Sequence, residues 1–213
     1  MDKTLFEKIW QHHLVQELDD GAALIYIDRV FLHERTGSIA LKSLEADKRK
    51  VVSPEHVFCT MDHIVDTVIG RGDNTKVPSG KNFILATREA CIDAKIKLFD
   101  VNDPQQGIVH VVSPELGIVQ PGATLVCPDS HTGGAGYVIE FGGTAVDALD
   151  IEGRLTLCNM AVEFSAFTGL VAPDDKAIAY LKGREYAPKG AVWQQAVAFW
   201  QSLYSDEHAQ FDK

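Results

Sequence analysis

Long apolar runs are absent from this chain of 213 residues, and no stretch approaches the roughly 18 continuous apolar residues of a membrane span. The first residues contain no basic stretch leading into an apolar run, so we expect a cytoplasmic protein that does not contact a membrane. Basic residues are scarce as well: 20 Lys and Arg stand against 30 Asp and Glu, giving a formal charge of −10. A surface of that sign does not neutralise phosphates, which excludes nucleic acid as an expected partner.

Cysteine is sparse and forms no ligand motif. Cys59, Cys91, Cys127 and Cys158 lie about thirty positions apart with no C-x-x-C pair. That pattern is typical of reduced thiols rather than of a disulfide framework or a zinc knuckle. The chain also lacks the G-x-S-x-G turn of serine hydrolases and the G-x-x-x-x-G-K loop that cradles phosphates. A content of 46% hydrophobic and 23% charged residues is that of an ordinary globular protein.

Hydrophobic periodicity indicates helices that alternate with short strands. Thr4 and Glu7 form a capping-box pattern ahead of the first helix. The apolar stripe from Phe83 to Leu98 predicts the longest helix, which begins near Ser79. The expected strands cover residues 23–27, 57–60, 108–112, 123–127 and 137–141, and the first of them is expected to be buried. Further helices cover about 39–48 and much of the chain after 150, ending with an amphipathic helix over 193–204.

This order of elements predicts a three-layer α/β/α fold around a mostly parallel sheet. We expect residues 1–213 to form a single domain. Its sheet lies in residues 1–150, and a mainly helical part, residues 151–213, packs on that core. The length of the chain is sufficient for one large hydrophobic core.

Residues that can bind a metal or transfer a proton follow several of the expected strands. They are Asp62 and His63, His110, the run Asp129, Ser130 and His131, and, on a later helix, Glu163. Open α/β sheets build their sites at the carboxyl ends of strands, because loops from neighbouring strands converge there. Taken singly, each residue also has a structural explanation, such as an Asp that caps a helix or a hydrogen-bonded core His. Taken together, imidazoles and carboxylates suit Fe2+ or Zn2+, and we predict one divalent metal ion held by His63, His110, His131 and Asp129.

A metal-free interpretation stays open. His63 paired with a carboxylate can carry out acid–base catalysis, with Ser130 beside His131. A serine nucleophile is disfavoured, because Asp129, Ser130 and His131 are consecutive and neighbouring side chains on a strand point to opposite faces. The histidines are far apart in sequence and contain no H-x-x-x-H signature, so their spacing does not decide between the two interpretations.

Six segments together carry a family resemblance that extends over nearly the whole chain. They are LIYIDR (24–29), HE (33–34), TMDH (60–63), QGIVHV (106–111), CPDSHT (127–132) and EGRLTLCNMAVE (152–163). In these segments the chain resembles the large subunits of 3-isopropylmalate dehydratases, in the aconitase superfamily. The resemblance implies an aconitase-like first-domain fold with an active site beside an iron–sulfur cluster. It places Asp62, His63, His110, Asp129, His131 and Glu163 in that site, with His33 near the substrate.

Departures from this family shape the expected chemistry. The family's cluster cysteines lie in G-S-C-T-N and G-C-x-x-C motifs, which this sequence lacks, and Cys127 and Cys158 match positions that are not ligands. After Thr132 the chain passes almost directly to glycine-rich residues 133–136, where the family pattern has roughly sixty more residues. We therefore expect no iron–sulfur cluster, and a single divalent ion that acts as a Lewis acid in its place.

The expected function is that of a shortened aconitase-superfamily enzyme, a lyase or hydratase that acts on a small hydroxy or carboxylic acid. The expected catalytic residues are Asp62, Glu163 and Ser130, and the expected substrate-binding residues are His33, Arg29 and Thr132. Two alternatives stay open: a non-heme Fe(II) oxidative enzyme with the same site, and a non-catalytic protein or one subunit of a split isopropylmalate isomerase. Apolar surface exposed by the missing segments predicts a homo-oligomer, most simply a dimer.

Overall fold

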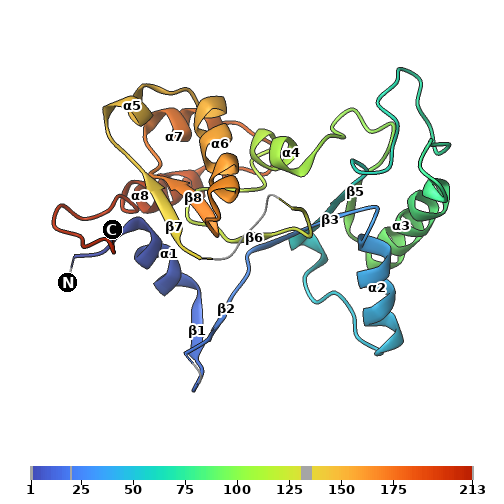
Figure 1. Cartoon of the computed structure of the whole chain (residues 1–213), viewed down its shortest axis with the longest axis horizontal. Helices are drawn as coiled ribbons and strands as arrows, with labels where there is room; N and C mark the ends of the chain where they lie inside the picture. The colour runs from blue at the N-terminus through green and yellow to red at the C-terminus, as the bar shows by residue number, and fades with distance from the viewer. Residues whose placement is uncertain (1, 20, 131–135, 213) are drawn as a thin grey trace. The chain divides into compact units, whose positions relative to one another are not determined.

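The computed structural model describes residues 2–19, 21–130 and 136–212, in which helices and strands alternate (Figure 1). The first half contains α1 (Leu5–His13), β1 (Leu14–Glu17), β2 (Ala23–Ile25), β3 (Arg29–His33), α2 (Gly37–Ala46), the 3-10 helix η1 (Pro54–His56), β4 (Val57–Thr60), α3 (Gly80–Ala94) and β5 (Lys97–Phe99). The second half contains α4 (Val109–Glu115), β6 (Leu125–Val126), β7 (Val138–Phe141), α5 (Thr144–Ala148), α6 (Ile151–Met160), the 3-10 helix η2 (Ala161–Phe164), β8 (Thr168–Val171), α7 (Asp175–Leu181) and α8 (Ala191–Gln201). A helix with the length and apolarity of a membrane span is not found among the described residues.

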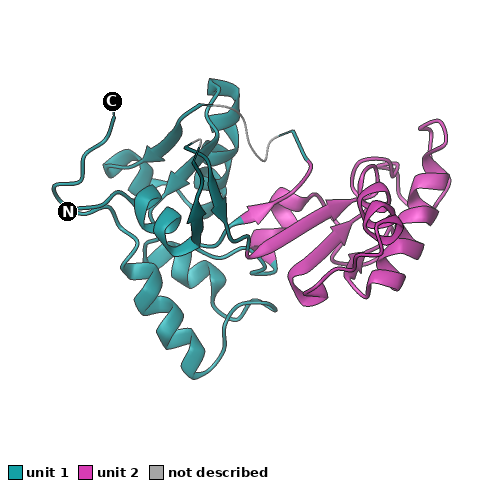
Figure 2. Ribbon diagram, turned by 90° about the horizontal axis from the view of Figure 1, so that it is seen from below, with its two compact units in different colours: residues 1–27, 116–124, 129–213 teal, residues 28–115, 125–128 magenta. Residues whose placement is uncertain are grey.

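The chain divides into two compact units, which Figure 2 colours separately. Residues 28–115 and 125–128 form one of them, which we call the sheet unit. Residues 1–27, 116–124 and 129–213 form the other, which we call the terminal unit because it includes both ends of the chain.

A four-stranded parallel sheet organises the sheet unit. Its strand order is β5-β4-β3-β6, and every neighbouring pair is parallel. The chain therefore extends the sheet from β3 through β4 to β5 and later returns to the other side of β3. Open α/β sheets commonly bind ligands beside such a reversal of strand order. The mixed α/β class with a mostly parallel sheet, which the sequence predicted, is confirmed.

Alternation along β3 and β4 gives the sheet two apolar faces. Leu32 and Cys59 lie in a buried cluster with Leu41 of α2 and with Ala90 and Cys91 of α3, so these two helices cover one face. The other face carries three stacked rings: Phe31 lies 5.7 Å from Phe58 and 6.2 Å from Phe99 between ring centroids. All three rings are buried.

The terminal unit has its own core and two small sheets. β1 and β2 form an antiparallel ribbon, and β7 and β8 pair in parallel. Leu5, Leu181, Trp200 and Leu203 form the centre of its buried cluster. Trp200 contacts Trp193 edge to face at 5.4 Å, so the tryptophans of the predicted last helix are core residues.

Local signals predicted several elements correctly. The capping box is present, since the Thr4 hydroxyl accepts from the backbone N–H of Glu7 and the Glu7 carboxylate accepts from that of Thr4. The strand over 57–60 appears as predicted, and the long helix begins after Ser79 as predicted. That helix ends at Ala94, however, because Lys97–Phe99 form β5 instead of a further helical turn. The first helix ends at His13, directly before β1 begins.

Two predicted strands are wrong in type or setting. Residues 108–112 were expected to form a strand, but they contribute to α4, because Val109 and Val112, three positions apart, are both buried on one helical face. The strand over 23–27 was expected to be buried, but β2 belongs to a two-stranded ribbon in which Leu24 is 52% exposed. The connection between β1 and β2 is short, so β2 pairs with β1 instead of joining the large sheet.

Candidate functional site

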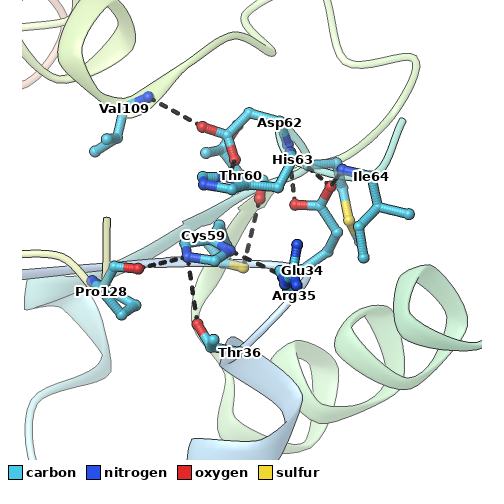
Figure 3. A network of polar contacts seen from close by, with 12 residues as sticks. Glu34, Arg35, Thr36, Cys59, Thr60, Asp62, His63, Ile64, Val109 and Pro128 are labelled. Atoms are coloured by element: carbon cyan, nitrogen blue, oxygen red, sulfur yellow. Dashed lines mark hydrogen bonds and ion pairs between the residues drawn. The ribbon is translucent and has the colours of Figure 1, made fainter. Parts of the chain in front are cut away.

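Two neighbouring strands of the sheet unit end at the same edge and bring four polar side chains together. β3 ends at His33 and β4 ends at Thr60, and these two residues are paired in the parallel register. Glu34 follows the first strand, and Asp62 and His63 follow the second (Figure 3). His33, Glu34, Asp62 and His63 each offer one possible ligand atom, and these atoms all lie within 4.8 Å of one another. We call this set the strand-end group.

Asp62 and His63 form a carboxylate–imidazole pair. Oδ1 of Asp62 lies 2.7 Å from Nδ1 of His63, with the Asp62 side chain only 2% exposed and the His63 side chain 30% exposed. Burial raises the pKa of the Asp62 carboxyl above its ordinary 3.8, the hydrogen bond from His63 opposes that rise, and the charge of Glu34 adds to it. A neutral His63 that donates from Nδ1 presents its lone pair on Nε2, the nitrogen then suited to proton transfer or metal binding.

His33 is buried behind this pair. Its ring stacks on the His63 ring with centroids 3.8 Å apart and planes inclined by 13°. Its Nδ1 accepts from the backbone N–H of Arg35 at 3.3 Å, which places the proton on Nε2, and that nitrogen donates to the carbonyl of Pro128 at 2.8 Å. Both ring nitrogens of His33 are therefore engaged by the backbone.

Glu34 is completely buried and accepts from three consecutive backbone N–H groups. Its Oε2 accepts from Asp62 at 3.0 Å, and its Oε1 accepts from His63 at 2.7 Å and from Ile64. The Thr87 hydroxyl of α3 donates to the Glu34 carbonyl at 3.1 Å. The carboxylate thus fills the turn that follows β4.

The segment before α4 closes the other side of the group. The amide of Gln106 donates to the carbonyl of Met61, and the Thr60 hydroxyl donates to the carbonyl of Gly107 at 2.7 Å. The backbone N–H of Val109 points at Oδ2 of Asp62 over 3.4 Å, a long contact. Asp62 therefore has polar neighbours on both of its oxygens.

The predicted site residues are distributed over both units. The structure brings His33, Asp62 and His63 together. His110 lies on α4, where its buried Nε2 has no hydrogen-bond partner among the described residues. Arg29 begins β3, at the opposite end of that strand from His33, and its guanidinium donates to the carbonyl of Asp28 at 2.7 Å.

Three of the remaining predicted residues lie outside the sheet unit. Asp129, Ser130 and Glu163 belong to the terminal unit, and Glu163 is exposed on η2. His131 and Thr132 lie outside the described residues. The roles of all five therefore stay predictions. Glu34 had no predicted role of its own; its sequence signal is its place in the HE segment (33–34) of the family resemblance.

Cys59 and Cys158 do not have the properties of ligands of an iron–sulfur cluster, which binds thiolates. Cys59 and Cys91 lie together in the apolar core beneath the sheet, whereas Cys158 belongs to the terminal unit. The contact with Cys91, followed by burial, raises the pKa of the Cys59 thiol, and burial raises the pKa of Cys158 to about 11. Such thiols are protonated at neutral pH, and the strand-end group contains none of them.

A comparison with protein families identifies a relationship over most of the chain. The model of the aconitase family (aconitate hydratase) matches residues 7–135 and 132–213. The two matched segments meet at 132–135, where the family pattern was expected to be interrupted. The first match contains every residue of the strand-end group.

Proposed function

The chain belongs to the aconitase family, and from that premise we propose that it adds water to, or removes water from, a small hydroxy or carboxylic acid. Asp62 and His63 are its proton-transfer pair in this proposal. The observation that carries it is the 2.7 Å contact between the buried carboxylate and the partly exposed imidazole at the open end of the sheet. Family membership supports an enzyme of the hydro-lyase type in general.

The pair has the chemistry that dehydration requires. A hydroxyl group leaves as water only after it has received a proton, and an imidazolium can donate that proton from Nε2. The Asp62 carboxylate stabilises the positive imidazolium and fixes its ring through Nδ1. In the reverse direction the neutral imidazole removes a proton from the attacking water. Glu163, with Ser130 as the other candidate, is proposed to take the carbon-bound proton.

A divalent metal ion at the same edge is a second candidate, because the four ligand atoms of the strand-end group lie within 4.8 Å of one another. Imidazole nitrogen and carboxylate oxygen suit Fe2+ or Zn2+, and a bound ion would polarise a substrate hydroxyl or carboxylate. Asp62 and His63 would hold it most readily, because the atoms of His33 and Glu34 already bind the backbone. Further ligands from His110, His131 and Asp129 stay part of this proposal.

One experiment tests both candidates. The purified protein is incubated with cis-aconitate, maleate and isopropylmaleate, alone and with Fe2+ or Zn2+, and loss of the conjugated double bond is followed by ultraviolet absorbance. We expect hydration of at least one acid, lost in His63→Gln and retained in His208→Gln, a variant at an exposed His of the terminal unit. Activity that is equal in His63→Gln would refute the proton-transfer role. Full activity of protein shown to be metal-free by elemental analysis would refute the metal.

A further inference from the structure

Glu34 has a more specific task than that of one possible metal ligand among four. We propose that Glu34 is a positioning residue, whose carboxylate fixes the backbone of residues 62–64 so that Asp62 and His63 face each other. The assignment of that pair to catalysis rests on the function proposed above. The geometry of the turn does not depend on it.

The contacts of Glu34 are specific to an acceptor with two oxygens. Three successive residues turn their backbone N–H groups toward one buried side chain, whose own exposure is 0%. Successive N–H groups that converge in this way form a concave anion-binding shape, which is usually filled by a ligand. Here the protein fills this shape with its own carboxylate, so each of the three buried N–H groups has a hydrogen-bond acceptor.

Glu34 also connects this turn to the rest of the sheet unit. It directly follows β3, its carbonyl accepts from Thr87 on α3, and its carboxylate holds the segment after β4. Two strand ends and one helix are thereby fixed relative to His63. The 2.7 Å contact of the Asp62/His63 pair needs this support, because neighbouring side chains in an extended segment would point apart.

The same contacts argue against Glu34 as a metal ligand. An ionised carboxylate has about four lone-pair positions, and three of them here face backbone donors. A cation would have to displace those donors and leave them buried without partners. Glu34 therefore serves the backbone, whether or not a cation binds at Asp62 and His63.

Amide hydrogen exchange of the full chain tests this assignment without a substrate. In the wild type, the amides of residues 62–64 should exchange at least tenfold more slowly than those of residues 72–74, which lie in an irregular segment of the same unit. Glu34→Gln should remove most of that protection, because an amide side chain offers one acceptor oxygen and adds two donors. Glu45→Gln, a matched change at an exposed glutamate of α2, should leave it unchanged.

Two further measurements separate positioning from simple stability. A downfield proton resonance from Nδ1 of His63 should be present in the wild type and in Glu45→Gln, and absent in Glu34→Gln. On any acid that the wild type hydrates, Glu34→Gln should lower kcat at least tenfold and change KM less than twofold. Unprotected amides at 62–64 in the wild type would overturn the assignment, even if Glu34→Gln fails to fold. So would a folded Glu34→Gln that keeps the resonance or keeps kcat, whereas a wild type inactive on every acid would refute only the proposed function.

Discussion

Replacement of Asp62 by Asn tests the electrostatics of the site through the stability of the protein. The Asp62 carboxyl is buried, and burial raises its pKa above the ordinary 3.8 that the unfolded chain restores. The folded protein therefore binds this proton more tightly than the unfolded protein does. The stability that Asp62 contributes is fully present below 3.8 and is lost as the pH rises through the raised pKa of the folded state.

The size of the effect follows from linkage. When folding raises the pKa of a carboxyl by one, the protein loses about 1.4 kcal/mol of stability above the titration range. The Asp62→Asn side chain cannot ionise, so this variant should gain stability relative to the wild type between acid and neutral pH, in proportion to the rise in the pKa of Asp62. Changes in packing alter both ends of the range alike and cancel from this difference, whereas the hydrogen bond from His63 is already included in the net rise of the Asp62 pKa.

The assay is urea unfolding of both proteins, followed by circular dichroism at a series of pH values from just below 3.8 to neutrality. The free energy of unfolding of Asp62→Asn minus that of the wild type should rise with pH. A flat difference would show that burial does not control this carboxyl. A difference that falls with pH would show that its partners lower the pKa, which contradicts the reasoning outright.

Three other changes have expected results of different kinds. His63→Gln should lower hydration activity about 100-fold or more, as loss of a general acid does, and change stability by less than about 1 kcal/mol, because the side chain is 30% exposed. Asp174→Ala should cost about 3–5 kcal/mol in urea unfolding, because it leaves the nearly buried guanidinium of Arg154 without its 2.6 Å partner and removes the cap of α7. Since Arg154 lowers the pKa of Asp174, this contribution should be present above 3.8 and disappear as the pH falls through the lowered value. Gly80→Ala should destabilise by about 1–3 kcal/mol, because its Cβ would lie 2.6 Å from Cγ2 of Ile64.

Matched variants make these outcomes decisive. Asp175→Ala changes an exposed Asp of the same helix, and Gly72→Ala adds a Cβ that meets no atom within 4 Å. Each should have a smaller effect than its counterpart at 174 or 80. An Asp174→Ala protein as stable as Asp175→Ala would show that the Arg154 ion pair contributes little. Equal stability of the two glycine variants would show that the turn before α3 accommodates the added Cβ without a loss in the free energy of unfolding.

Local patterns in the sequence explain much of the fold. The capping box at Thr4 and the apolar stripe of α3 are signals that lie within a few residues, and both helices begin where expected. The prediction failed at 108–112, where β-branched residues favour a strand, because burial of Val109 and Val112 favours a helix. Propensity along the chain does not contain that packing information.

The site was partly predictable from strand ends. Asp62 and His63 follow the strand that was predicted over 57–60. His33 was expected only from the family resemblance, because β3, which it ends, was not among the predicted strands. The role of Glu34 was not predictable, because its partners are backbone N–H groups 28 to 30 residues away. The residue types at those positions do not indicate such a contact, since every residue except proline carries the same backbone N–H donor.

Exchange of the substrate hydroxyl oxygen with solvent tests the central claim, that the Asp62/His63 pair transfers the proton of the leaving hydroxyl group in a hydro-lyase reaction, most directly. The protein is incubated with malate, citrate or 2-isopropylmalate in water enriched in the heavy oxygen isotope, and incorporation of that isotope into the hydroxyl group is measured by mass spectrometry. The account predicts incorporation by the wild type and by His208→Gln, lowered at least about 100-fold in His63→Gln and about 10- to 100-fold in Asp62→Asn. Incorporation at the wild-type rate by both site variants would contradict it.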